Sequence, residues 1–233
     1  MISALIITKD AYDRVKNLCT LLDPYVDEIV VFHSSAYLSR RFKEFSYENP
    51  KIYCSYSPPK GFVEAYYEKG IRLCKHDWIL LLDDDEIPNK ELLEQVKFTS
   101  EYHRPYAGYI NRFEPNGSIT TVLRLFHKGA VDITGLIHRG IEPKEGYESV
   151  KLPKLFYITH NSEHSFDKLE RFAKIEAQQY TDIIAYVALK QAKKYRLLKY
   201  AYFIVSSLPR VIFAPNKKDQ IVYLKYLWKE LRK

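Results

Sequence analysis

Cysteine is scarce in this chain of 233 residues, which contains only Cys19, Cys54 and Cys74. Their number is odd and they lie far apart, so the sequence has neither a disulfide framework nor the closely spaced cysteines of a zinc site. We therefore expect three buried thiols.

Long hydrophobic runs are also absent. No stretch of eighteen apolar residues occurs, so we expect no helix that spans a bilayer. The start, MISALIITKD, lacks the charged segment, long apolar centre and small-residue cleavage site of a signal peptide. The expected location is the cytoplasm, with the inner face of the cell membrane as a peripheral site.

Glycine-rich phosphate loops are missing as well. The chain has 8 glycines, and none form a Gly-x-Gly-x-x-Gly or a Walker-type loop. This argues against a dinucleotide-dependent dehydrogenase and against a P-loop enzyme.

Acidic residues are rare near the C-terminus. Residues 190–233 hold 12 Lys or Arg and 2 Asp or Glu, so this segment carries +10 and the first 189 residues carry −3 of the total +7. Its mixture of aromatic and basic residues is typical of a segment that docks on an anionic membrane surface, and it is equally compatible with an ordinary helix pair packed on the domain. No nucleic-acid fold signature accompanies the charge, so nucleic acid is not the expected partner.

Strands and helices alternate through the first hundred residues, which predicts an α/β nucleotide-binding half with a mostly parallel sheet. The expected strands are Ile2–Thr8, Glu28–Phe32 and Lys51–Tyr56. One helix is expected after Asp10, which is the candidate N-cap residue, and another after Gly61.

Short strands follow in YAGYINRF, ITTVLRLFHKG and AVDITGLIHRGIEP, and a helical pattern runs from Ser165 to about Gln191. Two further helices are expected at Arg196–Ser207 and Asp219–Leu231. We therefore predict a domain at 1–189, with halves 1–100 and 101–189, and a basic helical extension at 190–233.

The stretch WILLLDDDEIP places an apolar strand, Trp78–Leu82, directly before Asp83, Asp84, Asp85 and Glu86, and a helix is expected from Pro88. An acidic turn ahead of a helix N-terminus is one interpretation. The other is a divalent cation that binds a phosphate group at the carboxyl end of the strand. Because a cation offsets more of the carboxylate repulsion than a helix dipole does, we favour the second.

Three segments together resemble the family 2 glycosyltransferases of the GT-A fold, in particular small enzymes related to lipopolysaccharide-core glucosyltransferases. They are ISALIITKD with VDEIVVFHSS, GF with DWILLLDDDEIP, and LRLFHKG with GLIHRGIEP and ITHNSEHSFDKLERFAKIEAQQYTD. The resemblance covers roughly Ile2 to Tyr180. It implies a GT-A fold, with a Rossmann-like half and a mixed, mostly parallel sheet.

The resemblance also implies a metal site. Asp83 and Asp85 match the Asp-x-Asp pair that holds Mg²⁺ or Mn²⁺ against the diphosphate of a nucleotide sugar, and His138 is a further candidate ligand. The metal would act as a Lewis acid on the leaving diphosphate.

The implied donor site begins at Thr8 and Lys9, where the family holds the nucleotide base, and UDP is the usual nucleotide. His33 stands where relatives usually have Asp, and Tyr66 and Tyr67 stand where they often have a basic residue and Asn. The remaining expected donor contacts are Asp83, Asp84, Arg124, His138, Arg139 and His160.

An inverting transferase needs a base for the acceptor hydroxyl. Relatives often have His-Glu where this chain has His138 and Arg139, so Glu142 is the first candidate and Asp132 the second.

The sequence thus predicts a metal-dependent glycosyltransferase that moves a sugar, preferably from a UDP-sugar, to a hydroxyl of a glycan or a lipid-linked acceptor. A sugar nucleotidyltransferase and a catalytically inactive glycosyltransferase-like binding protein are the alternatives.

Overall fold

The computed structural model describes residues 1–99, 101, 104–161 and 170–179. The chain divides into two compact units, Met1–Ser162 and Glu163–Lys233. The second unit is described only at 170–179, which form a helix within the predicted helical segment. The boundary predicted at 189/190, the rest of that helix and both tail helices lie outside the described residues, so these remain predictions.

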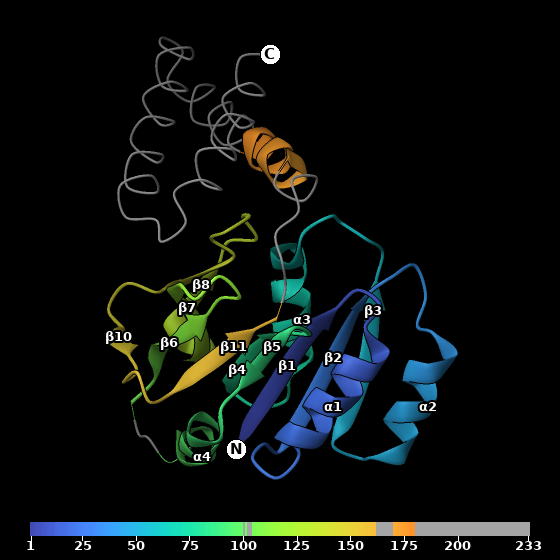
Figure 1. The fold of residues 1–233 in the computed structure, drawn as a ribbon, viewed down its shortest axis with the longest axis horizontal. Coiled ribbons are helices and arrows are strands. Elements are labelled where there is room, and N and C mark those ends of the chain that lie inside the picture. Colours follow the sequence, from blue (N-terminus) through green and yellow to red (C-terminus); the bar gives the residue numbers. More distant parts are fainter. Residues whose placement is uncertain (100, 102–103, 162–169, 180–233) are drawn as a thin grey trace. The chain divides into compact units, whose positions relative to one another are not determined.

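A nine-stranded mixed sheet organises the first unit (Figure 1). Its strand order is β3-β2-β1-β4-β7-β6-β11-β5, and β10 pairs with β6. The first four strands along this order are parallel, whereas β7 runs antiparallel to β4 and to β6. The strands of the large sheet are β1 Ile2–Thr8, β2 Glu28–Ser34, β3 Ile52–Ser57, β4 Trp78–Asp83, β5 Glu86–Pro88, β6 Tyr106–Phe113, β7 Ile119–His127, β10 Glu148–Lys151 and β11 Tyr157–His160.

Helices cover both faces of the parallel half, because its strands are apolar on both sides. One face packs against α1 Tyr12–Leu22, α2 Arg40–Glu48 and α4 Lys90–Thr99. The other packs against the short 3₁₀ helix η1 Val63–Tyr66 and α3 Tyr67–Leu73. In β4, Leu80 and Leu82 face the first helix layer, and Ile79 and Leu81 face the second. This arrangement confirms the predicted α/β class with a mixed, mostly parallel sheet.

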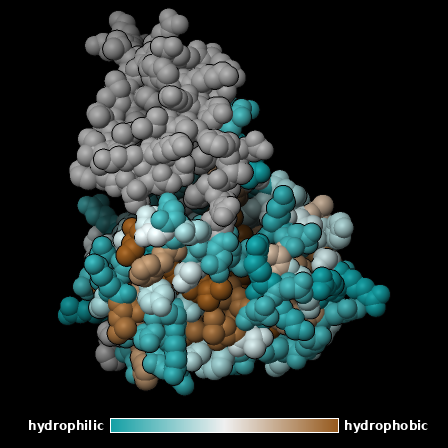
Figure 2. All heavy atoms as spheres, in the orientation of Figure 1, coloured by the Kyte–Doolittle hydropathy of each residue, from teal (hydrophilic) through white to brown (hydrophobic). Residues whose placement is uncertain are grey.

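A two-stranded sheet of β8 Val131–Ile133 and β9 Ile141–Pro143 follows a short 3₁₀ helix, η2 Lys128–Ala130. Polar residues cover most of the described surface seen in Figure 2, and apolar residues gather near its centre. No described helix is long and apolar enough to cross a membrane.

Several local predictions agree with the structure, and two are wrong. All three cysteines are buried, and burial raises the pKa of each thiol to about 12. Asp10 does not cap α1, because Ala11 is the N-cap residue and the hydroxyl of Thr8 accepts its N–H. Pro88 does not begin a helix either: it ends β5, and α4 begins at Lys90.

Candidate functional site

The carboxyl ends of the parallel strands meet at one edge of the sheet. Strand register places Thr8 beside His33 and Ile7 beside Asp83. In open α/β sheets ligands bind outside this edge, so the acidic end of β4 lies where a ligand site is expected.

Asp83 points toward the α3 side of the sheet, where Arg124 of β7 meets it. One guanidinium nitrogen of Arg124, Nη2, lies 2.7 Å from Asp83 Oδ2 and 2.8 Å from Glu86 Oε1. Its Nη1 donates to the hydroxyl of Tyr67 at 3.2 Å. Arg124 was a candidate phosphate contact, and the structure instead places it between two carboxylates.

The second oxygen of Asp83, Oδ1, is buried and accepts no hydrogen bond from the described residues. Burial raises the pKa of Asp83 to about 7, because the attraction of Arg124 offsets the loss of solvent only in part and the nearby Glu86 and Asp85 add repulsion. Among the described residues, the ionised carboxylate of Asp83 therefore has no hydrogen-bond donor or cation at Oδ1 to stabilise its charge.

Glu86 is fully buried and is satisfied by its neighbours. It accepts hydrogen bonds from Arg112 at 2.9 Å, from Arg124 at 2.8 Å and from the backbone N–H of Asp83 at 3.1 Å. Although burial acts to raise the pKa of Glu86, the two arginines outweigh it and the pKa is lowered. Glu86 thus holds the arginines and the start of the acidic turn in place.

Asp84 points to the opposite face of the sheet. Its carboxylate accepts from the hydroxyl of Thr8 at 2.5 Å and from Arg14 of α1 at 2.8 Å. Burial raises its pKa, and these two hydrogen bonds oppose the shift. Thr8 and Asp84, both expected at the donor site, therefore satisfy each other and tie the ends of β1 and β4 together.

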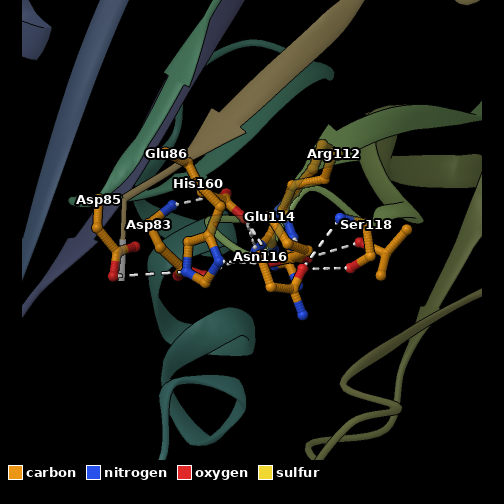
Figure 3. Close-up of polar contacts among 10 residues, drawn as sticks. Asp83, Asp85, Glu86, Arg112, Glu114, Asn116, Ser118 and His160 are labelled. Atoms are coloured by element: carbon orange, nitrogen blue, oxygen red, sulfur yellow. Dashed lines mark hydrogen bonds and ion pairs between the residues drawn. The ribbon is translucent and has the colours of Figure 1, made fainter. Parts of the chain in front are cut away.

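Asp85 lies beside His160, at the end of β11 (Figure 3). His160 Nε2 is 3.6 Å from Asp85 Oδ2, and His160 Nδ1 is 2.6 Å from Glu114 Oε2. Burial acts to lower the pKa of His160, but the two carboxylates raise it to about 9. Burial also acts on Glu114, whose pKa it would raise. The hydrogen bond from His160, together with Arg112 and Thr120, outweighs that effect and lowers the pKa of Glu114 to about 2.

Arg112 and Glu114 were not found from the sequence. They lie in and just after β6, and Arg112 Nε donates to Glu114 Oε1 at 2.8 Å. Their positions in NRFEP carry no local signal, because only the pairing of β6 with β7 and β11 brings them to the acidic turn.

A pocket of about 600 Å³ opens next to Arg124. The candidates His138, Arg139 and Glu142 line it, as the sequence analysis grouped them. Its other lining residues are Glu64, Tyr67, Tyr109, Arg112, Thr121, Val122, Leu123, Gly140, Ile141 and Pro143.

Two carboxylates of the pocket lining, Glu142 and Glu64, accept hydrogen bonds from other lining residues. Arg139 Nε donates to Glu142 Oε1 at 2.6 Å, and the backbone N–H of His138 donates to Glu64 Oε1 at 2.8 Å. Asp132 pairs with Glu142 in the register of β8 and β9, but it is exposed and does not line the pocket. Glu64 is a pocket carboxylate that the sequence analysis missed.

The remaining candidates lie near the ends of β1 and β2. His33 is 3% exposed and packs on Phe42 with the ring centroids 4.8 Å apart, whereas Lys9 is exposed. Tyr66 and Tyr67 are both buried, and the Tyr66 hydroxyl accepts from Ser34 Oγ at 2.7 Å.

The acidic turn fits a divalent cation that shares its ligands with a substrate. Within the described residues no group of three or more His, Cys, Asp or Glu side chains is arranged to hold a metal alone. Mg²⁺ usually needs only one or two carboxylates when phosphate oxygens and water complete its shell. Asp83 Oδ1, buried and unpartnered among these residues, and the neighbouring Asp85 satisfy that requirement.

Solved structures with a similar fold include two of one bacterial protein. The chain resembles the S. aureus TarS 1-349 structure in complex with UDP-GlcNAc, with a TM-score of 0.52 and 11% identity over 99% of this chain and 80% of that one. The UDP complex gives a TM-score of 0.51 and 12% identity over 99% and 91%. No family model and no curated protein sequence matches the chain. At this identity the likeness shows the fold alone, which is the α/β fold of a GT-A-like protein.

Proposed function

We propose that this chain is a metal-dependent glycosyltransferase that transfers a sugar from a UDP-sugar to a hydroxyl group of a glycan or a lipid-linked acceptor, with inversion at the anomeric carbon. The observation that carries the proposal is the pair Asp83 and Asp85 at the carboxyl end of β4, beside a pocket lined by arginines and carboxylates. The fold that the chain shares with a protein crystallised with UDP-GlcNAc supports this reading.

Asp83 and Asp85 would hold Mg²⁺ or Mn²⁺, which supplies Lewis-acid stabilisation to the departing diphosphate. Arg124 holds Asp83 through its contact with Oδ2, and the other oxygen, Oδ1, is buried without a hydrogen-bond donor among the described residues, so Oδ1 is the oxygen left for a cation. His138 is also a candidate metal ligand, and it lines the pocket. Its backbone φ of 62° lies in the left-handed region, and its N–H donates a hydrogen bond to Glu64 Oε1.

Glu142 is the better candidate for the base, because it lines the pocket and Asp132 does not. Arg139 engages Oε1 of Glu142 through two nitrogens, at 2.6 and 2.5 Å. This clamp leaves Oε2 to accept the proton of an acceptor hydroxyl bound in the pocket.

A panel of nucleotide sugars, tested with and without Mn²⁺, examines the donor proposal. A UDP-sugar should raise the melting temperature only when Mn²⁺ is present, because a ligand that binds the native state stabilises it. Asp85→Asn should remove this shift and abolish transfer, and circular dichroism should show that the unliganded variant remains folded. Transfer at the wild-type rate by Asp85→Asn would refute the assignment.

The same samples separate the two alternatives. A nucleotidyltransferase would release pyrophosphate from a sugar phosphate and a nucleoside triphosphate. A binding protein without turnover would show UDP and Mn²⁺ binding by calorimetry but neither transfer nor donor hydrolysis.

A further inference from the structure

Strand β11 holds Asp85 through both its backbone and a side chain. The backbone N–H of Asn161 donates to the carbonyl oxygen of Asp85 at 2.9 Å, which extends the antiparallel pairing of β11 with β5. The side chain of His160, which pairs with Glu86 in this register, places Nε2 at 3.6 Å from Asp85 Oδ2. The position of Asp85 therefore depends on a strand that follows it by seventy-odd residues.

Glu114 fixes the direction of the His160 ring. Glu114 Oε2 lies 2.6 Å from His160 Nδ1, and both side chains are 7% exposed. The other oxygen of Glu114, Oε1, accepts from Arg112 Nε at 2.8 Å and from Thr120 Oγ1 at 2.7 Å. Because Glu114 is itself held at three points, the histidine ring cannot turn without breaking a buried contact (Figure 3).

Orientation matters at this position because Asp85 follows the end of a strand. A carboxylate on a turn has several rotamers, and ordering it costs conformational entropy when a ligand binds. A second group that holds the carboxylate in its binding orientation removes that cost, as the outer partners of metal ligands generally do.

We propose that His160, oriented by Glu114, is a positioning residue that holds the carboxylate of Asp85 toward the cation and diphosphate of the donor. This inference rests on the proposed function. It differs from a direct donor contact by His160, because both ring nitrogens are directed at carboxylates of the protein.

Two substitutions at position 160 separate this role from a purely structural one. An Asn amide reaches about as far as ring Nδ1, so His160→Asn can keep the Glu114 contact and loses the Asp85 contact. A Gln amide reaches about as far as Nε2, so His160→Gln can keep the Asp85 contact and loses the Glu114 contact.

The measurement is Mn²⁺ affinity at saturating UDP, from the electron paramagnetic resonance signal of free Mn²⁺. His160→Asn should weaken binding by about 10-fold or more, and His160→Gln by only about 3-fold, on the scale of 10–100-fold known for lost outer partners of a metal. Glu114→Gln should fall between them, and the exposed Glu148→Gln on β10 should match wild type.

Each outcome decides a separate point. Equal affinity in His160→Asn and wild type, or a greater loss in His160→Gln than in His160→Asn, overturns the positioning role alone. Should circular dichroism show that the position-160 variants do not fold, wild-type affinity in a folded Glu114→Gln would overturn it. Wild-type protein that binds no Mn²⁺ overturns both this role and the metal-dependent function, whereas Mn²⁺ binding without sugar transfer overturns the proposed function only.

Discussion

The guanidinium of Arg124 is buried between two carboxylates. Arg124, 6% exposed, lies between Asp83 and Glu86, and the attraction of these carboxylates outweighs burial and raises its pKa well above the usual value for arginine. Such a pair adds little net stability against an apolar replacement, but removal of one member leaves an uncompensated buried charge.

We predict that Arg124→Met lowers the free energy of unfolding by about 3–5 kcal/mol, because it leaves Asp83 and Glu86 facing each other. Urea denaturation monitored by circular dichroism measures this change. The matched control is Arg72→Met, since Arg72 pairs with Glu68 on the surface of α3 with 77% of its side chain exposed. That pair should be worth about 0.5 kcal/mol or less. Equal effects in the two variants would contradict the prediction.

A second residue-scale prediction concerns the base. Glu142→Gln should lower kcat by about 100-fold or more, which is the usual contribution of general base catalysis. Asp132→Asn should leave kcat within about 3-fold of wild type, because Asp132 lies outside the pocket lining. Both variants should bind UDP as wild type does. Steady-state kinetics would contradict the assignment if Asp132→Asn were the more damaging change.

At the scale of elements, the acidic turn depends on contacts between segments that lie far apart in the chain. Asn89 joins two of them. Its Oδ1 accepts the N–H of Leu92 in the first turn of α4 at 3.2 Å and the N–H of Tyr157 in β11 at 3.0 Å. Its Nδ2 donates to the carbonyl of Leu155 at 2.8 Å. One side chain therefore caps a helix and anchors the strand that carries His160.

Asn89→Ala should destabilise the protein by about 2–3 kcal/mol, as the sum of a lost helix cap and one or two lost hydrogen bonds. Ser39→Ala is the matched control, because the Ser39 side chain caps α2 and, in the part of the chain that the structure describes, accepts from the Phe42 N–H alone, at 3.5 Å. It should cost about 1 kcal/mol or less. Chemical denaturation of both variants tests the difference, and a Ser39→Ala cost as large as that of Asn89→Ala would contradict it.

Sequence patterns located most elements, and the exceptions have local causes. Strand β6 was expected at Tyr106–Phe113 and is found there. Helix α2 was not predicted. Only Phe42 and Phe45 are buried on it, and two apolar residues are too few to give a recognisable helical periodicity. Strand β5 was missed because three residues after an acidic turn become a strand only when β11 pairs with them.

At the scale of the whole molecule, charge is separated along the sequence. The excess of positive charge in residues 190–233 contrasts with the net negative charge of residues 1–189. Basic segments near an anionic bilayer gain about 1 kcal/mol per Lys or Arg, and salt screens this attraction. We retain the proposal that this tail docks on an anionic membrane surface, where lipid-linked acceptors occur.

The protein should therefore co-sediment with vesicles that contain phosphatidylserine and not with vesicles of phosphatidylcholine alone. Binding should decrease steeply between 50 and about 500 mM salt, because the Debye length shortens over that range. Replacement of Lys193, Lys194 and Arg196 by Gln should weaken it, whereas replacement of Lys43, Lys51 and Lys60 should not. Equal sedimentation with both lipids would contradict the membrane proposal.

The sequence by itself determined the α/β class, the buried strand β4 and the emergence of Asp83 and Asp85 at its end, because hydrophobic periodicity and strand length are local properties. It also grouped His138, Arg139 and Glu142, which are close in the chain. Only the tertiary structure decided which charges offset those aspartates. Arg124 and His160 reach them through pairing between distant strands, and ion pairs depend on distances that no local pattern encodes.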